Sequence, residues 1–300
     1  MYEKIMVPLD GSSFAEEALP LAHLLARTLK AELHLVHVVS PSPDFALKSP
    51  EEDLAWTEFA RGKTAAYLDA HAERAKAAGA PALSAVLEGH VSAALESYAE
   101  SQKVDLTILT THGRSGASRW WIGSVTDELL RSSGADLLLV RPWDETDDRT
   151  RRTSRFGKIL VPLDGSKVAE TALSPATRIA DAFRSELVLA RVVPSPVELT
   201  SIYGVPGVEL RGEAYDARID EAKSYLHAVV GRLERRTAES LVIESGGAAE
   251  GIVEAARAGE VDLIAMASHG RGGLERALLG SVADKVLRAT TRPVLVVRPR

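Results

Sequence analysis

The chain contains no cysteine, which excludes disulfides, thiol catalysis and zinc–thiolate sites. It also lacks a basic excess, because 36 Lys and Arg stand against 42 Asp and Glu, a formal net charge of −6. Nucleic acids are bound through an excess of cations, so we expect no nucleic-acid partner. Charged residues or proline interrupt every apolar run before it reaches membrane-spanning length, and the N-terminus has no apolar leader. We therefore expect no membrane partner and a cytoplasmic location.

Several sequence segments of the first half recur in the second half. KIMVPLDGSSF at 4–14 is repeated as KILVPLDGSKV at 158–168, and DLTILTTHGRSG at 105–116 is repeated as DLIAMASHGRGG at 262–273. The two halves end in LLLVRP and VLVVRP. Self-similarity over this length indicates a tandem duplication of one domain.

A charged run separates the two copies. Residues 143–155 read WDETDDRTRRTSR, with no apolar period, which is typical of a solvated linker. The sequence therefore predicts a first domain at 1–142 and a second domain at 156–300.

Each half alternates between strand and helix patterns. Strands that alternate with helices predict parallel sheets covered on both faces, with right-handed crossovers. The fold class we expect is α/β, with two tandem Rossmann-like domains, each a five-stranded parallel sheet with helices on both faces. The predicted strands are 4–9, 32–39, 82–88, 105–110 and 136–140, then 158–163, 186–193, 240–244, 262–267 and 293–297; the predicted helices are 14–29, 51–79, 92–102 and 124–133, then 169–183, 214–238, 249–258 and 281–289.

Two features of the first half fall beyond strand ends. Asp10 follows the first strand, and a glycine-rich loop from Thr111 follows the fourth. In doubly wound sheets, ligands bind beyond the carboxyl ends of strands, where the strand order reverses. These two strand ends can flank that point.

The chemistry of the loop suits a phosphate. Gly113 permits a close backbone approach, Arg114 can reach phosphate oxygens, and a helix that starts near Ser124 exposes unpaired N–H groups. Ser124-Val-Thr-Asp127 also fits a capping pattern, so a well-capped helix after a flexible connector is the alternative interpretation. The P-loop pattern and the G-x-G-x-x-G fingerprint are both absent.

At these residues the chain resembles the universal stress protein family in its tandem-domain form. VPLDGS at 7–12 and 161–166 is similar to the family's opening signature. The family's ATP-binding subgroup carries Gly, two residues, Gly, nine residues, then Gly and Ser or Thr. The second, third and last positions of that pattern are Gly113, Gly123 and Ser124, and in the second copy Gly270, Gly280 and Ser281; the first position holds Thr110 and Ala267 instead of glycine.

The resemblance implies an adenine nucleotide alpha hydrolase-like sheet of order 3-2-1-4-5 that binds ATP or another adenine nucleotide with Mg or Mn. It also implies pairing through the last strand, either in a homodimer or between the chain's own halves. The nucleotide-binding residues that it implies, or that flank those positions, are Pro8, Asp10, Val38, Thr110, Gly113, Arg114, Gly123, Ser124 and Val125, then Pro162, Asp164, Val192, Ala267, Gly270, Arg271, Gly280, Ser281 and Val282.

Three functions remain open at this point. The first is a nucleotide-dependent regulatory protein of the stress response. The second is a slow ATPase or phosphotransferase in which Asp10 or Asp164 holds the metal. The third is an interaction scaffold with vacant sites. No residue stands out as a catalytic base, so we expect at most weak ATP hydrolysis, and the pattern points to no particular protein partner.

Overall fold

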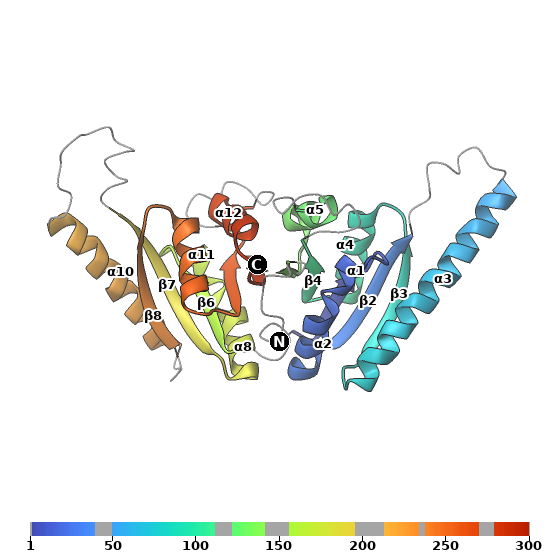
Figure 1. Ribbon diagram of the computed structural model, residues 1–300, viewed down its shortest axis with the longest axis horizontal. Coiled ribbons are helices and arrows are strands. Elements are labelled where there is room, and N and C mark those ends of the chain that lie inside the picture. Colours follow the sequence, from blue (N-terminus) through green and yellow to red (C-terminus); the bar gives the residue numbers. More distant parts are fainter. Residues whose placement is uncertain are drawn as a thin grey trace. The chain divides into compact units, whose positions relative to one another are not determined.

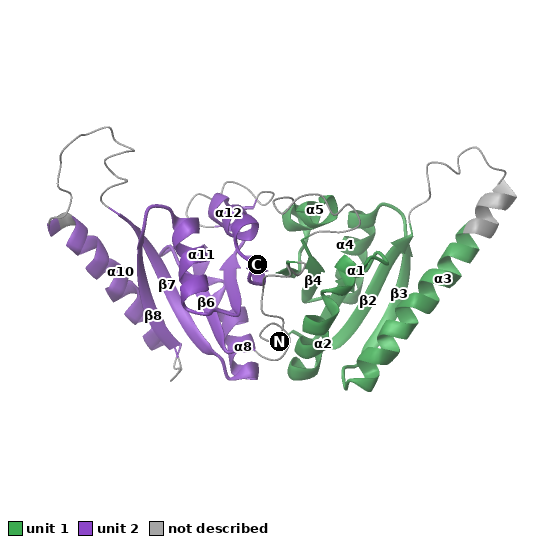
Figure 2. Ribbon diagram, in the orientation of Figure 1, with its two compact units in different colours: residues 1–154 green, residues 155–300 purple. Residues whose placement is uncertain are grey.

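The computed structural model falls into two compact units, residues 1–154 and residues 155–300 (Figure 2). The predicted linker at 143–155 lies outside the described residues. Of 50–56 and 214, only the backbone is described. The described residues are 2–39, 50–111, 122–141, 156–195, 213–233, 238–269 and 279–299.

Unit one contains a parallel sheet with its first strand at the centre. The strand order is β3-β2-β1-β4-β5, and these neighbouring strands pair in parallel. β4 and β5 are buried at every position, as expected for strands covered on both faces. The strands are β1 (Lys4–Pro8), β2 (Glu32–Val39), β3 (Ala82–Glu88), β4 (Leu106–Thr110) and β5 (Asp136–Val140).

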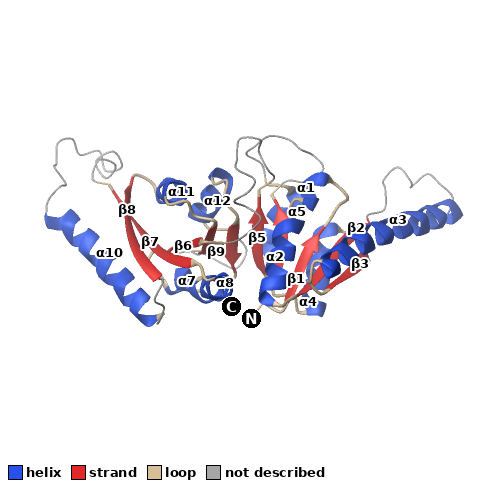
Figure 3. Cartoon of the chain, turned by 60° about the horizontal axis from the view of Figure 1, so that its bottom comes forward, coloured by secondary structure: helices blue, strands red, loops and turns tan. Residues whose placement is uncertain are grey.

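Helices cover both faces of this sheet (Figures 1 and 3). Because crossovers between parallel strands are right-handed, the face that a helix covers follows from the direction in which the chain moves across the sheet. Thus α2 packs over β1 and β2 and α3 over β2 and β3 on one face, while α4 and α5 contact each other on the other. The helices are α1 (Ser13–Glu16), α2 (Leu19–Leu29), α3 (Pro50–Ala77), α4 (Val91–Gln102) and α5 (Ser124–Ser132).

Unit two repeats this arrangement. Its strand order is β8-β7-β6-β9-β10, again with parallel pairs. The predicted α/β class, the parallel sheets and the duplication are therefore confirmed. The strands are β6 (Lys158–Pro162), β7 (Glu186–Pro194), β8 (Ala238–Ser245), β9 (Leu263–Ala267) and β10 (Val294–Val297); the helices are α7 (Lys167–Glu170), α8 (Leu173–Phe183), α10 (Glu213–Arg232), α11 (Ala248–Ala258) and α12 (Ser281–Ala289).

Three helix predictions are wrong in detail. The single helices expected at 14–29 and 169–183 are each two helices, α1 with α2 and α7 with α8. Pro20 and Pro175 lie in the first turns of α2 and α8, and a proline nitrogen cannot donate to the carbonyl one turn earlier. Ala238, expected as the end of a helix, begins β8 because the chain there pairs with β7.

The two long helices α3 and α10 show how the outer strands are covered. α3 packs on β2 and β3, and α10 packs on β7 and β8. Their buried residues recur at helical spacing, as in Leu68, Ala72 and Ala75 of α3.

Across the parts of the chain that are described, no helix is both long and apolar enough to cross a membrane.

Candidate functional site

Each central strand runs into a turn that fixes an aspartate. Asp10 Oδ1 accepts the backbone N–H of Ser12 at 2.9 Å, and Asp164 Oδ1 accepts that of Ser166 at 2.9 Å. Local bonds of this kind hold the backbone in a defined turn. Both aspartates are half-buried, and they lie at the carboxyl ends of β1 and β6.

The residue between the aspartate and the serine has a backbone conformation that favours glycine. Gly11 has φ 78° and Gly165 has φ 88°, a region that side chains with a Cβ rarely adopt. The serine that follows caps a short helix, since Ser12 accepts from the amide of Ala15 and Ser166 from the amide of Ala169. The Asp-Gly-Ser sequence thus links the strand, the turn and the helix in both copies.

The strand order reverses between β1 and β4 in unit one and between β6 and β9 in unit two. Each aspartate turn therefore lies beside the end of β4 or β9, as the sequence predicts. β1 pairs with β4 at Ile5–Leu106, and β6 pairs with β9 at Ile159–Leu263. The last residues of β4 and β9, Thr110 and Ala267, are both buried. Of the predicted phosphate-loop residues, Gly113, Arg114, Gly270 and Arg271 lie outside the described part of the chain.

The helices after β4 and β9 begin with a glycine cap. Gly123 and Gly280 are the N-cap residues of α5 and α12, and no side chain caps either helix. The Gly123 N–H donates to the Thr111 carbonyl at 2.8 Å, and the Gly280 N–H donates to the Ser268 carbonyl at 2.7 Å. These bonds anchor each helix start to the end of its neighbouring strand.

The capping pattern predicted for Ser124 and Asp127 is therefore wrong. Ser124 is the first helical residue rather than the cap. The Asp127 carboxylate instead pairs with Arg131 one turn later, at 2.9 Å, an arrangement typical of an exposed helix face. In the second copy, Asp284 pairs with Arg288 in the same way, at 2.9 Å.

This leaves the first turn of each helix suited to an anion. The first amides of a helix have no partner within the helix and carry part of its positive dipole. Ser124 and Ser281 are exposed, and Val125 and Val282 are half-buried. A phosphate can therefore reach these backbone N–H groups without displacing a capping side chain.

Val38 and Val192 lie within strands β2 and β7, where each strand extends past its central neighbour. The Leu9 N–H donates to the Val36 carbonyl at 2.8 Å, and the Leu163 N–H donates to the Ala190 carbonyl at 2.7 Å. Backbone groups of alternate residues in a strand point to the same side. Val38 and Val192 therefore direct an N–H and a C=O to the side where β1 or β6 has already ended.

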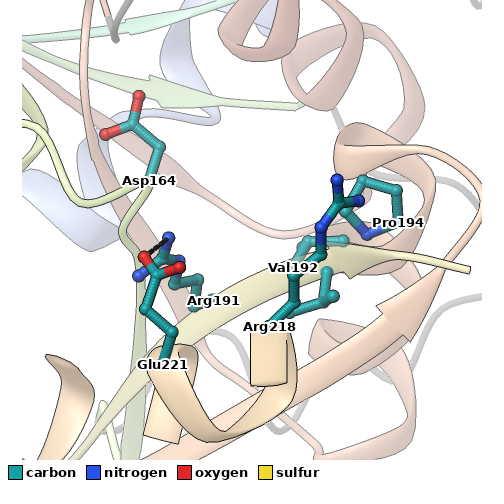
Figure 4. A pocket seen from close by; sticks show the side chains of 7 residues that line it. Asp164, Arg191, Val192, Pro194, Arg218 and Glu221 are labelled. Carbon is teal, nitrogen blue, oxygen red and sulfur yellow. Dashed lines mark hydrogen bonds and ion pairs between the residues drawn. The ribbon is translucent and has the colours of Figure 1, made fainter. Parts of the chain in front are cut away.

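In unit two, Asp164 and Val192 both border a cavity of about 390 Å³ (Figure 4). This volume is within the usual range for small-ligand sites. Asp164 comes from the turn after β6, and Arg218 and Glu221 come from α10. The other lining residues, from 191 to 194, belong to the end of β7. The lining residues are Asp164, Arg191, Val192, Val193, Pro194, Arg218 and Glu221.

A polar network ties one wall of this cavity to the aspartate turn. The Arg191 guanidinium pairs with Glu221 at 3.0 Å and lies 5.2 Å from the ring centre of Tyr225. The Tyr225 hydroxyl donates to Glu170 of α7 at 3.0 Å. Burial, and then the bond to Glu170, raises the pKa of Tyr225 well above its usual value, so the hydroxyl remains a donor.

Unit one contains the matching tyrosine and glutamate. The Tyr67 hydroxyl donates to Glu16 at 2.9 Å, and His71 lies 3.6 Å from the same carboxylate. Sequence analysis missed the Glu–Tyr pairs and the cavity arginines. The recurrence of both partners in the two copies is the signal that could have revealed the pairs; nothing in the pattern marks Arg191, whose counterpart in the first copy is His37.

His269 follows β9 directly, at the start of the second loop. Its Nδ1 lies 2.9 Å from the Ser268 hydroxyl. Burial, and then the nearby Arg298, lowers the pKa of His269, so the ring is neutral near pH 7. His269 can donate a hydrogen bond to a ligand but does not supply a positive charge.

No preformed metal centre is found among the residues that the structure describes, since no three His, Asp or Glu side chains there group as ligands. Mg²⁺ is often held by one or two carboxylates together with substrate phosphates. Asp10 and Asp164 fit that role for a metal that arrives with a phosphorylated ligand.

Known proteins resemble the chain along its whole length. The family model described as "Universal stress protein family" matches residues 1–141 and 155–298. A universal stress protein of Mycobacterium tuberculosis is 30% identical over 201 residues, which cover 66% of this chain but 63% of the relative. The aligned part thus spans less than two thirds of that protein.

Two other relatives align from end to end. A second universal stress protein of Mycobacterium tuberculosis is 27% identical over 303 residues, covering 98% of this chain and 96% of its own. The crystal structure of a universal stress protein from Archaeoglobus fulgidus superimposes with a TM-score of 0.70 at 20% identity, covering 99% of both chains. The latter likeness supports the shared fold.

Proposed function

The chain belongs to the universal stress protein family and carries two of the family's domains in tandem, and on that premise we propose that it is a regulatory protein that binds ATP or another adenine nucleotide. The proposed binding sites are the ends of β1 and β4 in unit one and of β6 and β9 in unit two. The observation that carries the proposal is that, in both copies, an uncapped helix N-terminus follows the strand beside the aspartate turn.

The phosphate end of the proposal rests on α5 and α12. Their glycine caps leave the first-turn amides open, and the dipole of each helix favours negative charge there. Gly123, Ser124 and Val125 would hold the phosphates in unit one, and Gly280, Ser281 and Val282 would hold them in unit two. The adjacent loop glycines and arginines remain predictions for the same role.

The nucleoside end rests on the aspartate turns and on the strand ends. Asp164 lies at one side of the cavity and can accept hydrogen bonds from ribose hydroxyls, as Asp10 can in unit one. The backbone N–H and C=O of Val192 can pair with the acceptor and donor on adjacent atoms of an adenine edge. The cavity volume of about 390 Å³ suits a nucleoside.

A charge introduced at each helix start tests the proposal. Ser124→Glu and Ser281→Glu each place a carboxylate where the phosphate would bind, at exposed positions where an acidic residue favours the helix. Like charges a few ångströms apart repel by several kcal/mol near a protein surface, so each change should weaken ATP binding at its own site at least about tenfold. Calorimetric titration of the full chain with ATP and Mg²⁺ measures the affinity and the number of sites.

The matched control is Ser101→Glu, the same substitution at an exposed residue of α4. We expect two binding events in this control and in the unaltered chain, one in each single variant, and none in the double variant. Binding that persists in the double variant, or no binding by the unaltered chain, would contradict the proposal.

A further inference from the structure

The two copies differ in the wall that α10 and α3 contribute. Tyr225 and Tyr67 are equivalent, since each donates to the glutamate of the short helix. Counting back from these tyrosines along the two helices, Arg218 corresponds to Ala60. At this helix position unit two therefore carries a guanidinium, which lines the cavity, where unit one carries a methyl group.

Of the two cavity arginines, Arg191 is already engaged. It pairs with Glu221 at 3.0 Å, packs against the Tyr225 ring, and leaves only 14% of its side chain exposed. Arg218 differs: among the described residues, its guanidinium has neither a hydrogen-bond nor an ion-pair partner. Figure 4 shows it beside Pro194, apart from the Arg191–Glu221 pair and across the cavity from Asp164.

We propose that Arg218 is a nucleobase-binding residue that makes the second site bind purine nucleotides more tightly than the first; this inference rests on the proposed function. With the ribose at Asp164, the base extends toward Val192, Pro194 and Arg218. The first two supply apolar contact. A guanidinium is planar and weakly hydrated, and it stacks on aromatic rings, so Arg218 can lie against the face of the base.

The chemistry predicts a preference for purines. Stacking strengthens with the size of the π face, and losing one base–aromatic stack costs between roughly fivefold and 150-fold in affinity. A guanidinium that acted only as a positive charge would instead strengthen the binding of any phosphate equally. The base and the phosphates can therefore be tested separately.

The experiment uses the full chain with one site blocked. In the Ser124→Glu background only the second site binds, and calorimetry is run with ATP, CTP and inorganic tripolyphosphate, each with Mg²⁺. Arg218→Ala should weaken ATP binding roughly tenfold, weaken CTP binding less, and leave tripolyphosphate within about twofold. Lys223→Ala is the control, because Lys223 is an exposed cation on the same helix that pairs with Asp220 and does not line the cavity.

The reciprocal substitution, which places an arginine at the equivalent position of unit one, tests whether an arginine there is enough to tighten ATP binding. In the Ser281→Glu background, Ala60→Arg should tighten ATP binding at the first site. An Arg218→Ala chain that binds ATP unchanged, or that loses ATP and tripolyphosphate affinity equally, would overturn the inference while leaving the proposed function intact. A Ser124→Glu chain that binds no ATP, with Arg218 in place, would instead count against nucleotide binding at the second site itself.

Discussion

His23 links the stability of unit one to pH. Within the described residues, its Nε2 is buried and has no hydrogen-bond partner. Burial, and then repulsion from His71, lowers the pKa of His23. The unfolded chain therefore binds a proton near pH 6.5 that the folded chain resists, so the titration of His23 costs no stability well above that pH and destabilises the fold as the pH falls below it.

Replacing His23 should remove part of that dependence. We expect the melting temperature of the His23→Gln chain to fall less than that of the unaltered chain when the pH is lowered from 7.5 to 5.5. Thermal unfolding followed by circular dichroism at several pH values measures this. His90→Gln is a suitable control, because His90 is exposed; equal pH slopes in all three chains would show that His23 contributes nothing.

Single residues of the candidate site differ in how far the sequence predicts them. Asp10 and Asp164 could be placed at strand ends because a short apolar run ends just before each of them. Arg191 and Arg218 could not be found, because their place in the cavity lining depends on how α10 packs over β7, which no local spacing encodes. The capping prediction for Ser124 was wrong because the helix begins one residue earlier than the pattern suggests: Gly123 is the N-cap, and its carbonyl accepts the Asp127 N–H at 2.9 Å.

The Glu–Tyr pair connects secondary-structure elements that are distant in the sequence. Tyr225 of α10 holds Glu170 of α7, and Arg232 of α10 binds the same carboxylate at 3.0 Å. Because α7 begins just after the aspartate turn, these bonds position that turn against α10.

Removing the hydroxyl tests the strength of this link. Tyr225→Phe should lower the free energy of unfolding by about 1 kcal/mol, since a half-buried hydrogen bond to a charged group is lost while the ring remains. Urea unfolding followed by circular dichroism measures the change. Tyr67→Phe is the counterpart in unit one, and unchanged unfolding midpoints would show that the pair is dispensable for stability.

At the level of elements, the strands were predicted more closely than the helices. β2 and β3 begin and end at the predicted residues, and the two strands pair with each other along nearly their whole length. The helices at 14–29 and 169–183 were predicted as continuous because their apolar spacing is continuous. The interruption comes from single proline residues, which the spacing does not reveal.

Across the whole molecule, we expect nucleotide to protect two separate sets of amides. Saturating ATP should slow hydrogen exchange at the start of α5 in unit one and of α12 in unit two, together with the aspartate turns. Ser281→Glu should abolish only the second set. Hydrogen exchange followed by mass spectrometry resolves the two, and protection that vanished from both units would contradict independent sites.

The duplication carries a consequence for how the chain would report on its surroundings. In an assembly of identical chains, a mutation changes every site at once, whereas here Ala60 and Arg218 are separate positions of one polypeptide. Unequal sites fill one after the other as nucleotide rises. A chain with the two unequal nucleotide sites proposed above would pass through a half-filled form between empty and full, and its occupancy would extend over a wider range of nucleotide concentration than two equal sites allow.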